Sequence, residues 1–478
     1  MIDGSASVLT LSLPIASPTI SSLAFISATP ETIFLRGSGF TEASSVIFEV
    51  RDANSSALPN VNVSMRLLTL TGGITMDGGT ADIVRASDAQ GRVTVRVNSG
   101  TLPTPVRVSA TIVGSTISTV SSNLSVAVGL PSQLNFSLSQ TTLNIEGYDI
   151  DGTPNAYQII AADRSGNPVP VGTSINFVAE GGQIEAIKQT AIVNGIARTV
   201  ANFVSAQPKP VDGRVTITAY ALGEESFVDL NGNNVRDAAE PFQDLGNIFK
   251  DRNYDGTFDA AVDEFVPLAV NNSAACAAPG SNLLLLDPSI PSVPATCDGT
   301  WSGAGQVYVR RAAETVLSTS DARPLLTSAS VQLAACAMPI TLQTGPAPTP
   351  PAPTPTTPFA FLAGSTWYGG ASGSINIVVA DNNPGSTVQI PNLFPRLNPM
   401  ASGTTVSASS PTTGFSATLG GGSPVPNTTE ASRASVSYNF SDPLVSSATV
   451  FVTFRSPSGT ATTVSFGVVR GARPSPCP

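Results

Sequence analysis

Histidine is absent from this chain of 478 residues, and lysine occurs only three times. Without histidine, a Ser-His-Asp site, a Cys-His site and a His-bearing zinc site are excluded. No Ser-x-x-Lys motif surrounds the lysines, and no glycine-rich phosphate loop joins a strand to a helix. A glycosidase needs only a pair of carboxylates, but outside the segment from Glu224 to Glu264 the acidic residues are scattered. We therefore predict that the chain is not an enzyme.

Charge of either sign is scarce, and positive charge most of all. Only 12% of residues are charged, the net charge is −10 and the pI is near 4.6. Nucleic-acid binding needs clustered Lys and Arg, so we predict no nucleic-acid partner, and anionic membrane surfaces are disfavoured for the same reason. No apolar run approaches the length of a transmembrane helix, so none is predicted.

The first residues, Met1 to Gly4, show neither a basic nor an apolar segment of a signal peptide. A cytoplasmic protein would fit this, as would a mature or truncated piece of an exported one. We favour export, because a low-charge, Ser/Thr-rich chain with a proline-rich stretch is typical of exported bacterial surface proteins. We therefore expect an extracellular or cell-surface location, with residues 1–21 a strand segment or a remnant of a preceding domain.

Aromatic residues make up only 6% of the chain, whereas Gly and Pro number 41 and 39. Helix formers such as Lys, Glu and Gln are few, and no long 3.6-residue periodicity occurs. Alternating apolar and polar residues, as in Val93-Thr94-Val95-Arg96-Val97, predict half-buried antiparallel strands. The composition favours many short strands joined by turns.

Similar patterns recur about every 100 residues. Apolar runs end at Asp52, Asp163 and Asp381, where the carboxylate can cap the following turn. Gln90-Gly91-Arg92 and Asn194-Gly195-Ile196 each open a strand. The spacing is 111 residues between Asp52 and Asp163, and 104 between Gly91 and Gly195. This period fits one immunoglobulin-like sandwich per repeat.

These turns and strands resemble the bacterial Ig-like domains of the invasin and intimin type. The residues that carry the resemblance are the Asp turn followed by Pro-Val, the segment Asp88 to Val93, and closing strands such as Val215 to Tyr220. It covers residues 22–127 and 131–222 well and 359–472 weakly. The resemblance implies an extracellular array used as a stalk, spacer or adhesive module, without shared catalytic residues.

We therefore predict an all-β chain of tandem immunoglobulin-like β-sandwich domains joined by short and Pro-rich linkers. The expected domains are 22–127, 128–343 and 359–478. Residues 344–358, seven of which are proline, would form a polyproline spacer between the last two. An acidic insertion at 223–300 would interrupt the second domain.

Four cysteines occur, Cys276, Cys297, Cys336 and Cys477, and the even count suits disulfides in an exported protein. Four cysteines allow three pairings. Pairing Cys276 with Cys297 would close a loop of about 20 residues, and Cys336 with Cys477 would then tie the ends of the last domain. Four buried free thiols are the alternative.

The acidic insertion holds the strongest chemical signal. Between Glu224 and Glu264 lie eleven acids and three bases, a net charge of −8. Two ladders there have the alternating oxygen ligands of calcium loops. The first comprises Asp229, Asn231, Asn233, the Val235 carbonyl, Asp237 and Glu240; the second comprises Asp251, Asn253, Asp255, Thr257, Asp259 and Asp263.

The first ladder has the EF-hand spacing with Asn234 where that loop has Gly, and the second needs one residue of slippage to reach Asp263. Paired loops 22 residues apart resemble the calcium loops of dockerin modules, although the flanks lack amphipathic helices. We predict calcium as the ligand. A solvated insertion whose Asp and Asn side chains make only Asx-turns is the alternative.

Three functions remain open. The first is a structural or adhesive surface array stiffened by calcium, whose partners are matrix components or other copies of itself. The second is a filament subunit that exchanges strands, with residues 1–21 as the donor. The third is a carbohydrate-binding accessory protein that stacks sugars on Trp301, Trp367 and Tyr368, although core packing is the commoner role of such side chains.

Overall fold

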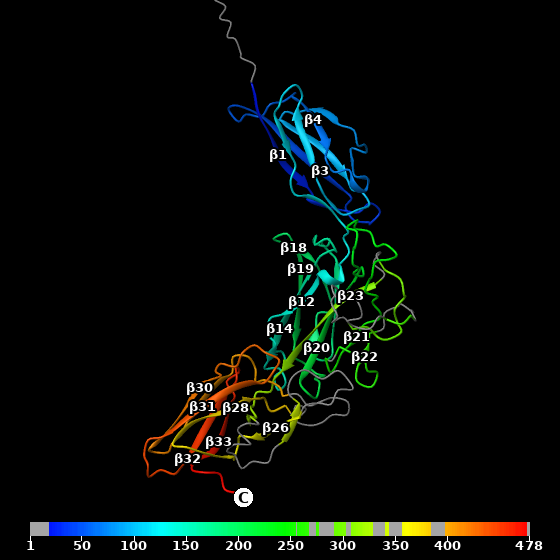
Figure 1. The fold of residues 1–478 in the computed structure, drawn as a ribbon. Coiled ribbons are helices and arrows are strands. Elements are labelled where there is room, and N and C mark those ends of the chain that lie inside the picture. Colours follow the sequence, from blue (N-terminus) through cyan, green and yellow to red (C-terminus); the bar gives the residue numbers. More distant parts are fainter. Residues whose placement is uncertain are drawn as a thin grey trace, which may run out of the picture. The chain divides into compact units, whose positions relative to one another are not determined.

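Strands form nearly all the regular structure of this chain, as the sequence predicts. The computed structural model describes residues 19–254, 256–266, 274–276, 291–302, 307–327, 340–343, 356–383 and 397–475. Within these ranges the only helical elements are two 3-10 turns, Thr71–Gly73 and Gln133–Asn135. The strands build three β-sandwiches in tandem (Figure 1), so the predicted fold class is confirmed. The chain divides into two compact units, one that contains the first sandwich and one that contains the others.

The first sandwich spans residues 19–129. Its sheets have the strand orders β1-β3-β7-β5, β10-β9-β4-β6 and β2-β11-β8. The strands are β1 Ile20–Thr29, β2 Thr32–Phe34, β3 Ala43–Asp52, β4 Asn62–Leu67, β5 Thr75–Met76, β6 Ile83–Ala86, β7 Arg92–Asn98, β8 Thr104–Val106, β9 Val108–Ile112, β10 Ser118–Val120 and β11 Leu124–Ala127. Alternate side chains of β7 are buried, and Val95 packs with Phe48, Met65 and Ile112 in one apolar core. Ile20 and Ser21, expected in a preceding segment, belong to β1; residues 1–18 lie outside the described residues.

The second sandwich begins at residue 130 and is completed only by β23. Its sheets have the orders β12-β14-β19-β16, with β18 beside β19, and β13-β23-β20-β15-β17. The strands are β12 Phe136–Gln140, β13 Asn144–Ile145, β14 Pro154–Ala161, β15 Ser174–Ala179, β16 Gln183–Ile184, β17 Ile187–Gln189, β18 Ala191–Val193, β19 Ile196–Val204, β20 Arg214–Gly223 and β23 Val307–Leu317. β20 and β23 pair along ten residues, so residues 224–306 form an insertion inside one hairpin.

The third sandwich starts earlier than expected. β24, Leu325–Leu326, already pairs with β26, Thr356–Phe361, and with β28, Ser372–Val379. β25, Ile340–Gln343, pairs with β26, so the proline-rich segment leads from one strand to its neighbour in the same sheet. The structure therefore places the boundary between the second and third sandwiches near residues 318–324, and not at the expected spacer 344–358. Residues 344–355 themselves lie outside the described residues.

The sheets of the third sandwich have the orders β25-β26-β24-β28-β31-β30 and β27-β33-β32-β29. The remaining strands are β27 Thr366–Gly369, β29 Thr405–Ser409, β30 Phe415–Gly421, β31 Ser432–Phe440, β32 Ser447–Arg455 and β33 Ala461–Arg470. Val436, Val450 and Phe454 are buried in its core.

Each sandwich contains the same parallel strand pair. A short early strand pairs in parallel with the last strand: β2 with β11, β13 with β23, and β27 with β33. The predicted Asp caps are also present. Asp52 accepts N–H bonds from Asn54 and Ser56, Asp163 accepts them from Ser165 and Asn167, and Asp381 accepts one from Asn383. These short-range bonds explain why the same turns recur along the chain.

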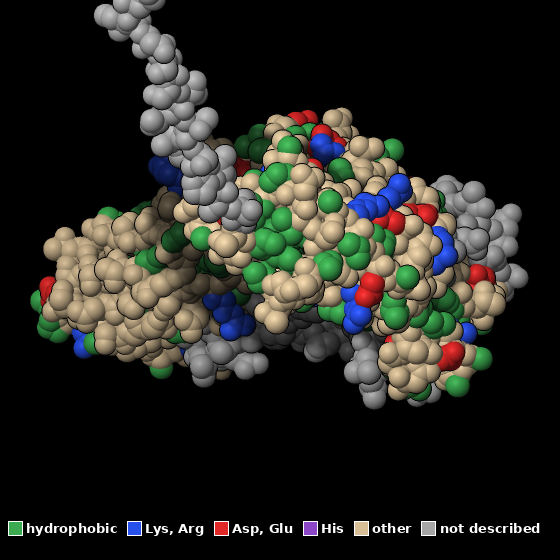
Figure 2. Space-filling model, turned by 90° about the horizontal axis from the view of Figure 1, so that it is seen from above, with side chains coloured by type: hydrophobic (Ala, Val, Ile, Leu, Met, Phe, Trp, Pro, Cys, Tyr) green, Lys and Arg blue, Asp and Glu red, His purple; other side chains and the backbone are tan. Residues whose placement is uncertain are grey.

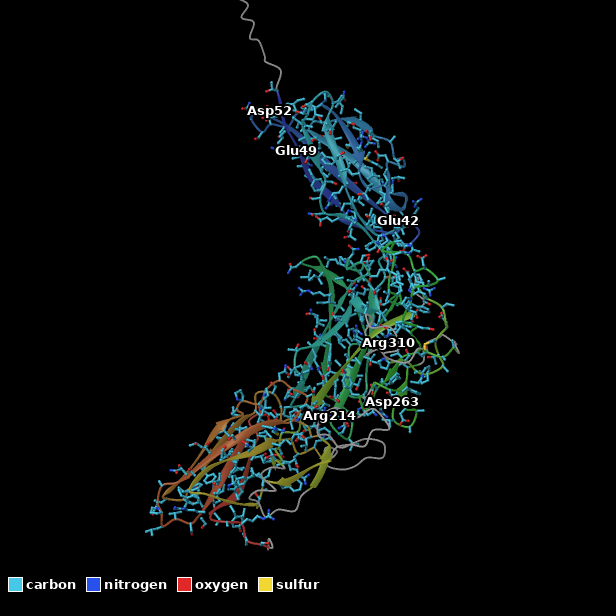
Figure 3. All side chains as sticks on the ribbon, viewed as in Figure 1. Glu42, Glu49, Asp52, Arg214, Asp263 and Arg310 are labelled. Carbon is cyan, nitrogen blue, oxygen red and sulfur yellow. A yellow bond between two sulfur atoms is a disulfide. The ribbon has the colours of Figure 1, made fainter. Side chains whose placement is uncertain are left out.

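Polar side chains join the second and third sandwiches. Arg214, labelled in Figure 3, pairs with Glu314 at 2.8 Å on the neighbouring strand. Its remaining donors reach the Asn398 side chain at 2.8 Å and the Leu397 and Thr429 carbonyls. Because this guanidinium is buried and makes several hydrogen bonds, it ties the end of β20 to loops of the next sandwich.

Candidate functional site

The acidic insertion is attached to the second sandwich by a buried arginine. Arg310 of β23, labelled in Figure 3, is 4% exposed. Its guanidinium donates to the carbonyls of Gly246 and Pro291 and to the Ser292 hydroxyl. Burial lowers the pKa of Arg310 to about 9, an effect that the charge of Glu225 opposes. Planar, multiply bonded Arg suits such a buried role better than Lys. One strand side chain thus holds two separate segments of the insertion.

A disulfide closes the far part of the insertion. Cys276 and Cys297 are joined, 21 positions apart, as one of the three pairings would have them. The Gly246 backbone packs against both sulfur atoms so closely that a Cβ there would meet Cys276 Sγ at 2.8 Å. Cys336 and Cys477 lie outside the described residues.

The first acidic ladder, residues 229–240 or loop 1, closes on itself. Glu240 is buried, and its two carboxylate oxygens accept the N–H groups of Leu230 at 2.8 Å and Asp237 at 2.9 Å. Asp229 accepts the N–H of Gly232, and Asn231 donates to Asp237 at 2.6 Å. The closing acid thus binds the backbone at positions 2 and 9 of the loop.

Asn234, which stands at the glycine position of an EF-hand loop, has φ +60°. This left-handed backbone is the conformation expected there, and Asn tolerates it better than most residues. Asn233 caps the turn by accepting the Val235 N–H at 2.7 Å. Arg236 lies over the Phe242 ring at 4.8 Å and donates to the Glu240 carbonyl.

The second ladder, residues 251–263 or loop 2, is closed by the same pair of backbone bonds. Asp263 accepts the N–H groups of Arg252 at 2.9 Å and Asp259 at 2.7 Å, again positions 2 and 9. Asp251 accepts the Gly256 N–H, and Gly256 has φ +76°. The shorter Asp closes loop 2 from position 13, whereas the longer Glu closes loop 1 from position 12.

A pair of phenylalanines on adjoining extended segments closes each loop at its base. At the base of loop 1, the backbone of Phe227 forms an antiparallel β-bridge with that of Phe242. At the base of loop 2, β21 (Phe249–Lys250) pairs with β22 (Glu264–Phe265), which places Phe249 opposite Phe265. The flanking segments are extended and not helical, so neither loop has the helical frame of an EF-hand or dockerin module.

The sequence shows this repeat more fully than the spacing of calcium ligands does. Both segments read Phe-x-Asp-x-Asn, then Asp-Ala-Ala, then an acid, any residue and Phe. The alternation of oxygen-bearing residues indicated the ligands, whereas the framing phenylalanines and the Asp-Ala-Ala triplet indicate the duplicated loop itself.

Most predicted ligands lie on the loop surfaces, and several are already engaged in hydrogen bonds. Asn231, Asn233, Val235, Thr257 and Asp259 are exposed, whereas Asp229, Asp237, Asn253 and Asp263 are half-buried. Among the described residues, no group of three or more His, Cys, Asp or Glu side chains lies in a metal-holding arrangement. Glu240 and Asp263 account for part of this absence of a metal-holding group, because their carboxylate oxygens accept backbone N–H groups. Asp255 lies outside the described residues.

Loop 2 contacts the second sandwich directly. Thr216 of β20 donates from its hydroxyl to the Asp251 carbonyl at 2.7 Å, and Arg252 lies 3.5 Å from Glu180. Burial and the charge of Asp212 raise the pKa of Glu180 to about 9. The start of loop 2 is therefore coupled to buried polar groups of the sandwich.

Two consecutive acids lie where β20 passes into the insertion. Glu225 accepts the N–H groups of Leu245 at 2.7 Å and Ser302 at 2.8 Å, and burial raises its pKa to about 8. Glu224 pairs with Arg164 at 2.7 Å, and burial raises its pKa to about 7 despite that cation. Both side chains bind segments distant in sequence and so fix the start of the insertion.

The proposed sugar-stacking residues are engaged in packing. The Trp301 indole donates to the Glu225 carbonyl at 2.9 Å and meets the Phe227 ring edge-on. Trp367 packs against the core of the third sandwich, and its indole N–H lies 3.3 Å from the Tyr438 hydroxyl. Tyr368, next to it on β27, is half-buried. Both indoles therefore have structural contacts that account for their positions.

On the face drawn in Figure 2, acidic and basic side chains are few and scattered, and apolar side chains lie between them. Among the described residues, no helix has the length and apolar character needed to cross a membrane.

Comparison with known proteins gives similarities of fold alone. No protein-family model and no curated protein matches the sequence. Among solved structures, the D0-D1 domains of intimin share 18% identity with a TM-score of 0.20, over 42% of this chain and 90% of that one. Invasin, a bacterial integrin-binding protein, shares 12% identity with a TM-score of 0.24, over 96% of this chain and 61% of that one. The adhesin InvE of Yersinia pseudotuberculosis shares 17% identity with a TM-score of 0.17, over 42% and 56%.

Proposed function

We propose that this chain is part of a bacterial cell-surface adhesive or structural protein, a non-enzymatic array of sandwiches whose acidic insertion is ordered by calcium. The tandem sandwiches, the low surface charge and the Ig-like turns support the scaffold role. The duplicated loop supports calcium: two segments with hard oxygen donors have the same closing bonds and the same phenylalanine base.

The donor set fits calcium better than a transition metal. Asp229, Asn231 and Asp237 in loop 1, and Asp251, Asn253 and Asp259 in loop 2, offer only carboxylate and amide oxygens, the ligands that calcium prefers. A bound calcium ion would supply positive charge to a segment of net charge −8. The protein's own part is to hold these loops closed, through Glu240 and Asp263 on the backbone and the phenylalanine pairs at the base.

Thermal unfolding of the full chain in excess calcium and in EDTA tests the calcium part. Calcium that binds only the folded state raises the unfolding free energy by about 2.7 kcal/mol at a hundredfold excess over Kd. Asp229→Asn and Asp251→Asn keep the shape of each cap and remove its charge, so they should reduce this rise. Asp52→Asn alters a similar cap in the first sandwich and should leave the rise unchanged. An unfolding temperature equal in calcium and EDTA would contradict a calcium role.

The adhesive part is tested separately. Beads coated with the chain should be retained on cell or matrix surfaces more than beads coated with an inert protein of similar charge. Equal retention of both kinds of bead would overturn the adhesive role and leave the calcium result standing.

A further inference from the structure

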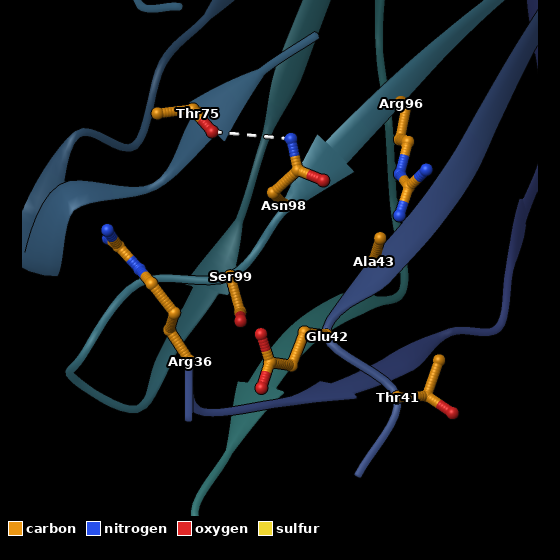
Figure 4. A pocket seen from close by; sticks show the side chains of 8 residues that line it. All are labelled: Arg36, Thr41, Glu42, Ala43, Thr75, Arg96, Asn98 and Ser99. Carbon is orange, nitrogen blue, oxygen red and sulfur yellow. Dashed lines mark hydrogen bonds between the residues drawn. The ribbon is translucent and has the colours of Figure 1, made fainter. Parts of the chain in front are cut away.

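A polar pocket of about 330 Å³ opens at one end of the first sandwich, away from the acidic insertion in sequence. Its lining includes Arg36 after β2, Glu42 before β3, Thr75 of β5, and Arg96, Asn98 and Ser99 at the end of β7. In Figure 4 the Glu42 carboxylate and the Ser99 hydroxyl lie between the two arginines. The volume is at the lower end of the range of about 300–1,000 Å³ for ligand pockets, so it suits one small molecule or one unit of a polymer.

Ser99 is the feature that points to a ligand. Ser99 lines the pocket and is 3% exposed, but its hydroxyl is covered by neighbouring atoms and has no hydrogen-bond partner among the described residues. Buried hydroxyls normally have a partner, and leaving one unsatisfied costs about 1–3 kcal/mol. The neighbouring Asn98 amide makes only a long bond of 3.3 Å to the Thr75 hydroxyl. A polar molecule in the pocket would bond the Asn98 amide directly, and it would bond the Ser99 hydroxyl once that side chain rotates toward the pocket.

The arginines add donors for a negative group. Arg36 donates one N–H to the Gly73 carbonyl, and its other donors remain available. The Arg96 guanidinium makes no hydrogen bond or ion pair within the described part of the chain, and it lines the pocket from β7. A guanidinium binds a carboxylate through two parallel bonds, which gives direction as well as affinity.

The remaining groups restrict the ligand further. Glu42 accepts the Gly37 N–H through one oxygen, and its carboxylate lowers the net charge of the lining from two arginines to +1. That single positive charge favours a monoanion over a phosphate dianion. Hydroxyls and an amide, from Thr75, Ser99 and Asn98, match a ligand rich in hydroxyl groups. No aromatic ring lines the pocket, so stacking is not the mode of binding.

We propose that this pocket binds one carboxylated sugar unit, such as a uronic or sialic acid residue, with its carboxylate on Arg96 and its hydroxyls on Glu42, Asn98 and Ser99. The binding itself is independent of calcium and of the insertion. It rests on the proposed function only in that an adhesive protein would use the pocket to hold a surface glycan.

Saturation-transfer NMR and calorimetry with the full chain test this proposal, with glucuronate and N-acetylneuraminate as probes and glucose and inorganic phosphate as comparisons. Glucuronate or N-acetylneuraminate should bind at least tenfold more tightly than glucose and more tightly than phosphate. Arg96→Gln should weaken binding at least tenfold, and Ser99→Ala should weaken it several-fold, with unfolding temperatures used to confirm that both variants fold. Arg85→Gln is the matched control, because Arg85 is paired with Asp77 at 2.7 Å and does not line the pocket.

Several outcomes would overturn the proposal: no binding of either acidic sugar, equal binding of glucose, tighter binding of phosphate, or unchanged affinity in Arg96→Gln. Each of these leaves the bead-retention and calcium experiments untouched. If beads adhere but acidic sugars do not bind, adhesion uses another surface, and the pocket assignment alone fails.

Discussion

The first and second sandwiches have related strand arrangements but differ in one hairpin. In the first, residues 113–117 connect β9 to β10; in the second, residues 224–306 connect β20 to β23. Their apolar cores are alike in kind, with Phe48 buried in one and Phe203 in the other. Apolar packing suffices to form a sandwich of either type.

The two sandwiches differ in their buried charges. Within residues 19–129, Glu49 is the one buried ionisable side chain, and it pairs with Arg51 at 2.6 Å at the surface. The second sandwich and its insertion bury Glu224, Glu225 and Arg310 among others. These three side chains contact the insertion and not the apolar core. The insertion, residues 224–306, is therefore held by polar bonds to a sandwich whose core is complete without it. The first sandwich should therefore unfold independently of conditions that loosen the insertion.

The largest expected effect comes from Arg310→Met, which keeps apolar volume and removes the guanidinium. The carbonyls of Gly246 and Pro291 would lose their donor, and Glu225 would lose the attraction of this cation, so the change should cost about 3–5 kcal/mol. Denaturant unfolding followed by Trp301 fluorescence in a Trp367→Phe background measures it. Arg51→Met, at a half-exposed pair of the first sandwich, should cost under about 1 kcal/mol. Because that sandwich has no tryptophan, its unfolding is followed by circular dichroism. Equal costs would remove the distinction drawn between the two sandwiches.

Removing the disulfide should be the next largest effect. Replacing Cys276 and Cys297 by Ser releases a loop of about 20 residues, which corresponds to roughly 3 kcal/mol of loop entropy. The loss should appear in the Trp301 signal and as faster proteolysis within 224–306, with the first sandwich unchanged. Proteolysis that begins in the first sandwich would contradict this division. Trypsin suits the measurement because Arg236, Lys250 and Arg252 lie in the insertion.

The insertion should also respond to pH in a definite direction. The folded-state pKa of Glu225, at about 8, lies above its ordinary value because of burial. Stability from this group is therefore full below about pH 4.5 and is lost as the pH rises through about 8. Glu225→Gln keeps the shape, cannot ionise, and should flatten the decline between these values. The matched change Glu49→Gln in the first sandwich should leave this decline in stability unchanged. If Glu225→Gln does not alter the decline, Glu225 is not its source.

Local patterns explain which parts of the structure were predictable. The alternation in Val93 to Val97 and the Asp caps act over a few residues, so the sequence carries them openly. The position of Asp263 in loop 2 was likewise deducible from spacing. By contrast, β24 is only two residues long, and its place in the third sandwich depends on partners more than thirty residues away. Because of that distance, the local sequence of the proline-rich segment predicts a spacer and not a connection within one sheet.

The attachment of the insertion was not predictable for a related reason. Arg310 lies in an ordinary strand pattern, in which a charged residue is expected to face solvent. Its burial depends on Gly246 and Pro291, which reach it only after a long excursion of the chain. Similarly, the role of Ser99 at the pocket depends on neighbours from three separate strands.

The smallest expected effects compare one turn in the two sandwiches. Gly91 has φ +71° and lies just before β7, and Gly195 has φ +77° and lies just before β19. Alanine at either position incurs the left-handed backbone cost of about 1–2 kcal/mol. At Gly91 the new Cβ would also lie 2.6 Å from the Val50 carbonyl oxygen, whereas at Gly195 nothing lies within 4 Å. Gly91→Ala should thus lower the unfolding temperature of the first sandwich more than Gly195→Ala lowers that of the second, as calorimetry can measure; equal shifts would show that the close backbone approach at Gly91 relaxes without cost.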